Sequence, residues 1–551
     1  MRQTVAKCLL ALVFGAAMTM SFAPADAWWF TPYCLAGLFM LAAGCGARLG
    51  FALGLSFGLG WFGLGLWWTA GAMARFTQAG TGLSVTLTGA LCVYLSLFPA
   101  IVMALYGWLV RTGPAQLRAA PGVFVLAALW TLGEWSRANL LGGMPLLATG
   151  YAHASGPLGG FAPAIGVLGL GFLNAVVAAA LAQCLTELGK AGGWRRWRYF
   201  PLALLALCLA GSGLDRIDWT HATGQTLRLS LLQGNLSQQE KFTPQGFRRA
   251  VETYAALIRS SSADLTVLPE TALPIEWYSS PPELIAAWRG LAAERRTSLV
   301  IGAVAAAPSR PGLVGDSTNS ALVMLPDSAQ PGYDYRYDKI HLLPLAEYAP
   351  PGAGWIAQRV QPELGTLLAG DPDQPPLHLA QGAVALGICY ESMFDTLIAR
   401  KARTANLILN ISNFAWFTGS YADAQHLQAG RMRARETGRW FVQSANTGIT
   451  AIVDPHGVVR QVLPADVTGV LEGAVTMQDG STPFMLMGNA PLLAACLVFL
   501  GTMLRSRPVP MDIVAGISAL RRTCRENAAF LPGRLQEGGS CQAEDLSLNV
   551  A

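Results

Sequence analysis

Charged residues are scarce in this 551-residue sequence, because aspartate, glutamate, lysine and arginine make up 13% of it while hydrophobic residues make up 52%. Soluble domains usually carry about a quarter of charged residues. The lysines and arginines form no basic patch interleaved with aromatic residues, which argues against nucleic acid as a partner. No spacing of histidine, cysteine and acidic residues has the pattern of a metal site. The composition therefore excludes an ordinary soluble chain and predicts a polytopic membrane protein.

Cysteine is almost absent from the more polar half of the chain. Cys389 is the only cysteine between Leu214 and Thr482, and the other nine lie in apolar segments or in the C-terminal tail. A single cysteine cannot form an internal disulfide. It follows an apolar run at 383–388 that is typical of a buried strand, where a side chain can point into a cleft. Cys389 is thus a candidate nucleophile, although a cysteine in such a run can equally be a small buried hydrophobe.

Long runs with few charges predict about eight transmembrane helices, since about 20 apolar residues cross a bilayer. These runs are 8–22, 28–47, 51–74, 82–110, 119–133, 160–186, 199–214 and 483–504. The fifth and the seventh are short for this purpose. We therefore expect a membrane domain at 1–214, a separate domain at 215–481, a last span at 482–505 and a tail at 506–551.

Lysine and arginine lie mainly on one side of these predicted spans. One set of loops and ends carries Arg2, Lys7, Arg48, Arg111, Arg118, Lys190, Arg195, Arg196, Arg198, Arg505 and Arg507, and the other carries Arg75 and Arg137. Because positive loops stay in the cytoplasm, both termini are expected there and residues 215–481 on the outer side. The N-terminal segment also resembles a cleavable signal peptide ending at Ala25-Asp26-Ala27, and its removal would leave the remaining topology unchanged.

From Leu227 the hydrophobic pattern changes to alternating strands and helices. Alternation at 227–235 and short apolar runs predict strands around 227–235, 265–270, 298–306, 319–326, 382–392 and 406–412, with two more within 441–459. Helical periodicity predicts helices at 246–260, 282–296 and 421–439. This alternation over about 265 residues predicts one α/β domain of ordinary size.

Three polar residues stand at the ends of apolar runs in this domain. They are Glu270 in TVLPETALP, Lys339 in YRYDKIHLLP, which we take as a strand, and Cys389 in GAVALGICYES. In this order and context they resemble the catalytic triad of the nitrilase superfamily. Together with the predicted spans, the chain to about Leu504 resembles the apolipoprotein N-acyltransferase family.

Further motifs extend this resemblance, and two positions depart from it. The motifs are Glu347 in LAEYAP, Tyr390 and Glu391 after the cysteine, ISNFAWF at 411–417, QHLQAGRMRARETGR at 425–439 and SANTGIT at 444–450. Phe414 replaces an aspartate that is common in the family. Phe242 replaces a tryptophan that the family often has in the early loop of this domain. The resemblance implies an α-β-β-α sandwich. It also suggests Phe242, Trp416 and Phe417 as substrate contacts.

The chemistry follows from the residue types. A thiol with an ordinary pKa of about 8.5 is mostly protonated at neutral pH, so it needs a base and a positive charge nearby. Glu270 can accept the proton, and Lys339 can stabilise the thiolate and the oxyanion. By the resemblance, Glu347 would hold Lys339 or assist proton transfer, and the backbone amide of Tyr390 would be a second oxyanion donor. A Cys-His pair with His341 is the alternative arrangement.

The family resemblance implies a specific reaction in the bacterial inner membrane. A phospholipid would donate a fatty acyl chain to Cys389, and the α-amine of a diacylglyceryl-modified N-terminal cysteine of an apolipoprotein would accept it, with the catalytic domain in the periplasm and no cofactor. Aromatic side chains such as Trp277, Tyr278 and Trp355 would help to admit lipid tails and exclude water. Two alternatives remain open: a membrane-tethered amidase acting on small amides, and a transporter or receptor with an outer domain.

Overall fold

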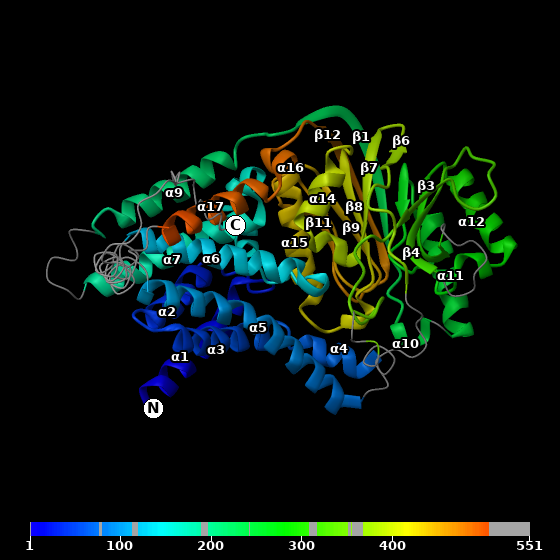
Figure 1. Ribbon diagram of the computed structural model, residues 1–551. Coiled ribbons are helices and arrows are strands. Elements are labelled where there is room, and N and C mark those ends of the chain that lie inside the picture. The colour runs from blue at the N-terminus through cyan, green and yellow to red at the C-terminus, as the bar shows by residue number, and fades with distance from the viewer. Residues whose placement is uncertain are drawn as a thin grey trace, which may run out of the picture. The chain divides into compact units, whose positions relative to one another are not determined.

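The computed structural model describes residues 2–76, 80–112, 120–188, 197–241, 243–307, 317–350, 354 and 367–505. The chain through Thr502 forms one compact unit. The first part of this unit is helical, and the second part is built on two β-sheets (Figure 1). The predicted tail at 506–551, like Phe242 and Trp355, lies outside the described residues.

Each predicted span contains a helix, but the structure does not confirm the count of eight spans. The helices before the sheets are α1 (Arg2–Met18), α2 (Phe30–Ala42), α3 (Ala47–Gly65), α4 (Trp68–Phe76), α5 (Gly80–Thr112), α6 (Ala120–Asn139), α7 (Ala162–Leu188) and α9 (Phe200–Leu214). Within the described residues, four helical stretches are long and apolar enough to cross a membrane: Arg2–Ser21, Ala47–Gly65, Gly80–Thr112 and Gly159–Leu188. Several other predicted spans hold helices that are too short, and the predicted span at 51–74 divides into α3 and α4.

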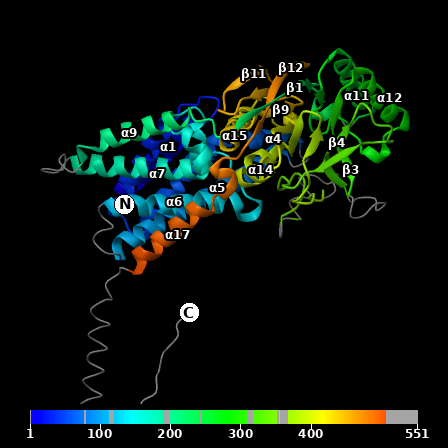
Figure 2. The same ribbon diagram turned by 90° about the horizontal axis from the view of Figure 1, so that it is seen from above.

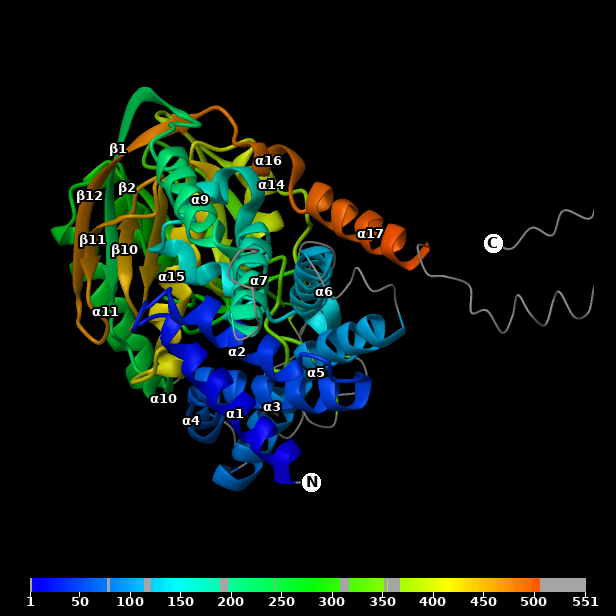
Figure 3. The same cartoon turned by 90° about the vertical axis from the view of Figure 1, so that its left-hand side faces the viewer.

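Glycines let the helices α1, α3 and α5 approach one another closely. A Cβ atom on Gly15 of α1 would lie 1.9 Å from the carbonyl oxygen of Phe57 in α3, and one on Gly54 of α3 would lie 2.3 Å from that of Pro99 in α5. Such close backbone contact is typical of helix packing in membranes. There the hydrophobic effect does not drive helices together, and small residues allow the close van der Waals packing that does. Figure 3 shows α3 between α1 and α5.

The second part of the unit contains two six-stranded sheets. The first sheet has the order β12-β1-β2-β3-β4-β5 and the second β11-β10-β9-β8-β7-β6. The strands are β1 (His221–Gln233), β2 (Leu265–Val267), β3 (Ser298–Ala306), β4 (Ser317–Met324), β5 (Tyr335–Asp338), β6 (Leu377–Leu379), β7 (Gly382–Ile388), β8 (Leu407–Ser412), β9 (Phe441–Ala445), β10 (Thr450–Val453), β11 (Val459–Leu463) and β12 (Gly469–Asp479). In each sheet the three central strands β1-β2-β3 or β7-β8-β9 run parallel, and antiparallel strands flank them.

Helices cover both outer faces of the paired sheets, which confirms the α-β-β-α sandwich (Figure 1). The central core contains Leu229, Val267, Leu386 and Leu409 from the facing sheets. Outside the first sheet lie α11 (Pro244–Ser260) and α12 (Pro282–Arg295), and outside the second lie α14 (Asp395–Ala402) and α15 (Ala422–Thr437). The central strands β2, β8 and β9 are buried on both faces, and strands of this kind read as nearly continuous apolar runs.

The sandwich packs against the helical part through α15, which contacts α7. The buried carboxylate of Glu436 in α15 accepts a hydrogen bond of 2.7 Å from the backbone N–H of Val167 in α7. After β12 the chain continues in α16 (Pro483–Met487) and α17 (Ala490–Arg505). Figure 2 shows α17 beside α6, where the rings of Phe124 and Phe499 are 6.3 Å apart. The helical part thus contacts the sandwich through a buried polar group, and α17 contacts α6 through apolar rings.

Candidate active site

Cys389 lies directly after the buried strand β7, as predicted from its apolar run. Its backbone has φ of 52°, a left-handed conformation that is unfavourable for a residue with a Cβ atom. The short helical turn Cys389–Met393 begins there. Such local strain is often found at functional sites, where the surrounding structure holds it in place. The turn leaves Cys389 less buried than Ile388 and Tyr390 on either side of it.

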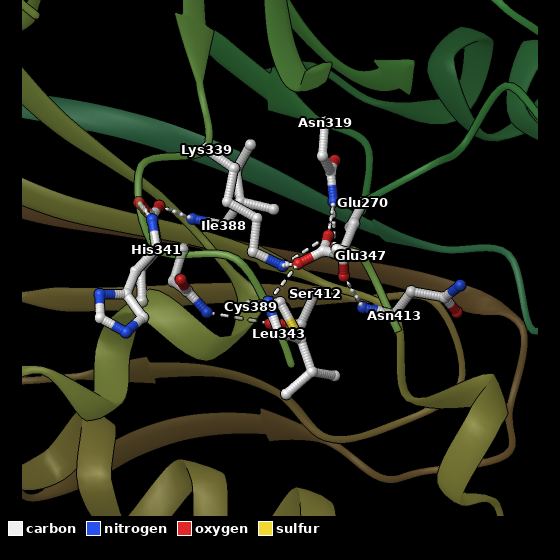
Figure 4. A network of polar contacts seen from close by, with 12 residues as sticks. Glu270, Asn319, Lys339, His341, Leu343, Glu347, Ile388, Cys389, Ser412 and Asn413 are labelled. Atoms are coloured by element: carbon white, nitrogen blue, oxygen red, sulfur yellow. Dashed lines mark hydrogen bonds and ion pairs between the residues drawn. The ribbon is translucent and has the colours of Figure 1, made fainter. Parts of the chain in front are cut away.

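Lys339 is the centre of a buried cluster of charges. Its ammonium lies 2.8 Å from Glu347 Oε2 and 3.5 Å from Glu270 Oε1, and its side chain is 2% exposed. Figure 4 shows these three side chains converging beside the sulfur of Cys389. The structure therefore brings together Glu270, Lys339, Glu347 and Cys389, which are separated by up to 119 residues in the sequence.

Two asparagines fix the carboxylates. The side-chain amide of Asn319 donates to Oε1 of Glu270 at 2.7 Å and to Oε1 of Glu347 at 2.8 Å. The backbone N–H of Asn413 donates to Oε2 of Glu270 at 2.8 Å. Sequence reasoning missed Asn319, whose only signal is a polar residue near the start of the apolar strand β4. These bonds leave each carboxylate one orientation, with Glu270 and Glu347 directed to the same ammonium.

The charges and the burial of the cluster favour a protonated Lys339 and a neutral Cys389 thiol. Burial lowers the pKa of Lys339, but the attraction of Glu347 and Glu270 is larger and raises the pKa above its ordinary value. Burial and the negative charge of Glu270 raise the pKa of the Cys389 thiol, which Lys339 only partly offsets. The resting site therefore holds a charged lysine beside a protonated thiol.

Glu391 and Tyr390 connect this cluster to the rest of the fold. Glu391 is fully buried, and its carboxylate accepts hydrogen bonds from the backbone N–H of Ile340 at 2.8 Å and of Ile388 at 2.7 Å. It thus joins the segment after Lys339 to the end of the strand before Cys389. The hydroxyl of Tyr390 donates to the carbonyl oxygen of Gly143 at 2.7 Å. Both residues hold segments of the site in place through their side chains.

The expectation that 340–344 continues a strand is wrong. Strand β5 ends at Asp338, because the N–H groups of Ile340 and His341 donate to Glu391 and not to a neighbouring strand. The ring of His341 is instead hydrogen-bonded through Nε2 to the carbonyl oxygen of Gly142 at 2.8 Å. Burial lowers the pKa of His341, so its ring is neutral at pH 7.

The suggested substrate contacts have different surroundings. Trp416 and Phe417 are partly exposed in the turn Phe414–Phe417, and the ring of Phe417 meets that of Trp68 in α4 edge-on at 5.1 Å. Trp277 is buried in the core between the first sheet and its helices, so it does not roof the site. Tyr278 is 51% exposed.

Sequence reasoning also missed Lys241, which precedes Phe242. Its side chain is 1% exposed, and its ammonium has no hydrogen-bond partner among the residues that the structure describes. Burial lowers the pKa of Lys241 to about 7, although the charge of Glu270 raises it. An amine that is partly charged at neutral pH thus interacts with Glu270, and the sequence signals it only as a polar residue at the end of a short helix. The described part of the chain contains no group of three or more His, Cys, Asp and Glu residues that could hold a metal ion.

Comparisons with known proteins match a family model to each of the two parts of the chain. Residues 14–180 match the family model "Apolipoprotein N-acyltransferase N-terminal domain", and residues 228–482 match the model "Carbon-nitrogen hydrolase". The chain is 37% identical over 507 residues to an apolipoprotein N-acyltransferase of Ralstonia nicotianae, covering 90% of this chain and 93% of that protein. It is 37% identical over 447 residues to one of Nitrosomonas europaea, covering 80% and 85%.

Solved structures of the nitrilase superfamily resemble the sandwich more distantly. Saccharomyces cerevisiae Nit3 is 17% identical, covers 46% of this chain and 90% of its own, and has a TM-score of 0.35. The sequence relatives, in contrast, span both the helical part and the sandwich. The chain therefore belongs to the apolipoprotein N-acyltransferase family.

Proposed function

We propose that this protein transfers a fatty acyl chain from a membrane phospholipid to the α-amino group of the diacylglyceryl-modified N-terminal cysteine of apolipoproteins, through a thioester on Cys389. The supporting observation is the cluster in which Lys339 contacts Glu270 and Glu347 beside the thiol of Cys389 (Figure 4). A carboxylate and an ammonium in contact, with a thiol beside them, provide a base, an oxyanion donor and a nucleophile. No cofactor is needed for this chemistry.

In the first half-reaction, the sulfur of Cys389 attacks the ester carbonyl of the phospholipid while Glu270 takes the thiol proton. The negative charge that forms on the carbonyl oxygen is stabilised by Lys339 and by the backbone N–H of Tyr390. The carbon–oxygen ester bond then breaks, and the leaving alkoxide takes the proton from Glu270. The products are the thioester and a lysophospholipid.

In the second half-reaction, the uncharged α-amine of the apolipoprotein attacks the thioester carbonyl. Glu270 takes a proton from the attacking nitrogen, the carbon–sulfur bond breaks, and the proton returns to the sulfur of Cys389. The products are the N-acylated lipoprotein and the free thiol. Glu347 keeps Lys339 in place and charged through both steps, which its contact of 2.8 Å supports.

A site at the outer face of the membrane would exclude water, and an amine would then resolve the thioester in place of water. The termini would lie in the cytoplasm and the sandwich, at 215–481, in the periplasm. The reason is that most positive charges lie in the two ends of the chain and in the loops on the same side of the predicted spans. Residues 1–214 and 482–505 would then span the inner membrane. Trp416 and Phe417, which lie between the sandwich and α4, would contact the acyl chain at this boundary.

A reconstitution assay tests this function. Purified protein is mixed with phospholipid vesicles and a diacylglyceryl-modified lipopeptide that has a free N-terminus, and the mass of the lipopeptide is followed. The proposal expects a gain of one acyl chain on the amine and an equal amount of lysophospholipid. Release of ammonia from small amides without any lipopeptide acylation would identify a tethered amidase instead.

A further inference from the structure

A loop of the helical part contacts segments next to two of the site residues. It follows α6 at Leu140, and its carbonyl oxygens at Gly142 and Gly143 accept hydrogen bonds from His341 Nε2 at 2.8 Å and from the Tyr390 hydroxyl at 2.7 Å. His341 is two residues after Lys339, and Tyr390 is the residue after Cys389. Two adjacent carbonyls therefore hold the segments that carry the ammonium and the thiol.

The loop needs support to keep this shape. Leu141, Gly142 and Gly143 have φ of 54°, 89° and 72°, so three successive residues are left-handed, and Leu141 is strained there. A Cβ atom on Gly143 would lie 2.0 Å from the carbonyl oxygen of Ala138. The two carbonyls point at the sandwich only in this conformation, so whatever fixes the loop also fixes the two contacts.

Arg137, the last basic residue of α6, supplies this support. Its guanidinium Nη1 donates to the carbonyl oxygen of Leu146 at 2.8 Å and also to that of Met144. These bonds join the end of α6 to the far end of the loop. The side chain is 1% exposed and packs over the rings of Trp61 and Phe62. Both bonds come from Nη1, and a lysine would carry its ammonium one bond closer to the backbone and without the planar group that lies over the two rings, so lysine reproduces the geometry poorly.

We propose that Arg137 is a positioning residue for the transfer reaction, which acts through the loop 140–146 on Tyr390 and His341 and so sets the placement of Cys389 and Lys339. This inference rests on the proposed role of Cys389. It gives the helical part a task beyond anchoring, because the site keeps its geometry only while the loop holds it. It also gives His341 a role as a hydrogen-bond donor and not as a base.

A double-mutant cycle tests the connection. The variants are Arg137→Lys, Tyr390→Phe and their combination, and the measured quantity is the single-turnover rate of acyl-enzyme formation at saturating phospholipid. Loss of one hydrogen bond typically costs about tenfold in an equilibrium or a rate. If Arg137 acts through the loop on Tyr390, each single variant loses about tenfold, and the double variant loses about as much as the worse single one and not a hundredfold.

Arg439 provides a matched control. It is 2% exposed, and its guanidinium also donates to two carbonyl oxygens, those of Ala405 at 2.8 Å and Gly480 at 2.7 Å. Within the described residues it makes no hydrogen bond to the loop 140–146. Arg439→Lys combined with Tyr390→Phe is expected to give the product of the two single effects. Multiplicative effects for the Arg137 pair as well would overturn the inference, because they would show that Arg137 acts independently of Tyr390.

The role of His341 is tested by two further variants. His341→Gln keeps a side-chain N–H for the carbonyl of Gly142, and His341→Leu does not. We expect the leucine variant to lose about tenfold in rate and the glutamine variant to lose clearly less, with the same pH profile as the parent. Equal losses would overturn this part. A parent protein that forms no acyl-enzyme would instead refute the proposed function.

Discussion

Replacing Lys339 by methionine removes the one ammonium that contacts both carboxylates of the cluster. Glu270 and Glu347 would remain, each with an Oε1 atom bonded to the same amide group of Asn319. Because the Lys339 side chain is 2% exposed, water does not replace the lost charge. Removing one partner of a buried ion pair costs about 3–5 kcal/mol. The same change removes an oxyanion donor, which typically costs about a hundredfold to a thousandfold in rate.

The pH dependence gives this prediction a sign. The raised pKa of Lys339 means that its contribution is fully present below the unfolded lysine pKa of about 10.4, so it is constant between pH 5 and 8. In Lys339→Met, the two facing carboxylates raise each other's pKa above the ordinary value of about 4.3. The folded variant then binds more protons than its unfolded chain, and its stability rises as the pH falls towards 5.

Thermal unfolding in detergent at pH 8 and pH 5, followed by tryptophan fluorescence, measures this difference. We expect the melting temperature of Lys339→Met to fall well below that of the parent at pH 8 and to recover part of the gap at pH 5. Arg249→Met is the control, because its ion pair with Glu240 is 67% and 61% exposed and is worth about 0–1 kcal/mol. The reasoning would be refuted if Lys339→Met had the melting temperature of the parent at pH 8. It would also be refuted if the difference in melting temperature from the parent were the same at pH 8 and pH 5.

Three further substitutions test other parts of the account. Lys241→Met should raise the melting temperature more at pH 6 than at pH 9. The pKa of about 7 means that the buried lysine lowers the stability of the folded protein most below pH 7, where it is charged. An equal rise at both pH values would contradict this. Asn319→Leu should lower the single-turnover acylation rate at least tenfold, since it removes bonds to two carboxylates, and an unchanged rate would exclude that role. Gly143→Ala should lower the same rate while Gly63→Ala, with open space around its Cβ, should not; equal rates for both would contradict the loop's role.

Strand ends were predictable from the sequence where the strand is short, apolar and parallel. Cys389 directly follows β7 as expected, because a central parallel strand must be apolar on both faces and the residue after the apolar run marks its end. Strand β2 lies within its predicted range but ends at Val267, three residues before Glu270. The segment after Lys339 was not predictable. Its alternating residues suit a strand, but the distant carboxylate of Glu391 takes the N–H groups of Ile340 and His341 that a neighbouring strand would need.

Contacts between distant parts of the chain could not be predicted from local patterns. Asn319 bonds two carboxylates that lie 49 and 28 residues away, and the loop after Arg137 meets Tyr390 from 247 residues away. Hydropathy predicted where apolar helices lie but not where each helix ends. The run at 51–74 is uniformly apolar, yet it holds two helices, α3 and α4.

The intact mass of the protein after incubation with phospholipid alone, without any acceptor, tests the central claim most directly. We predict a gain of one fatty acyl chain on Cys389 that hydroxylamine removes, as expected for a thioester, and no gain in Cys389→Ala. An adduct that persists in Cys389→Ala, or N-acylation of a lipopeptide by that variant, would contradict the claim that this thiol carries the acyl chain.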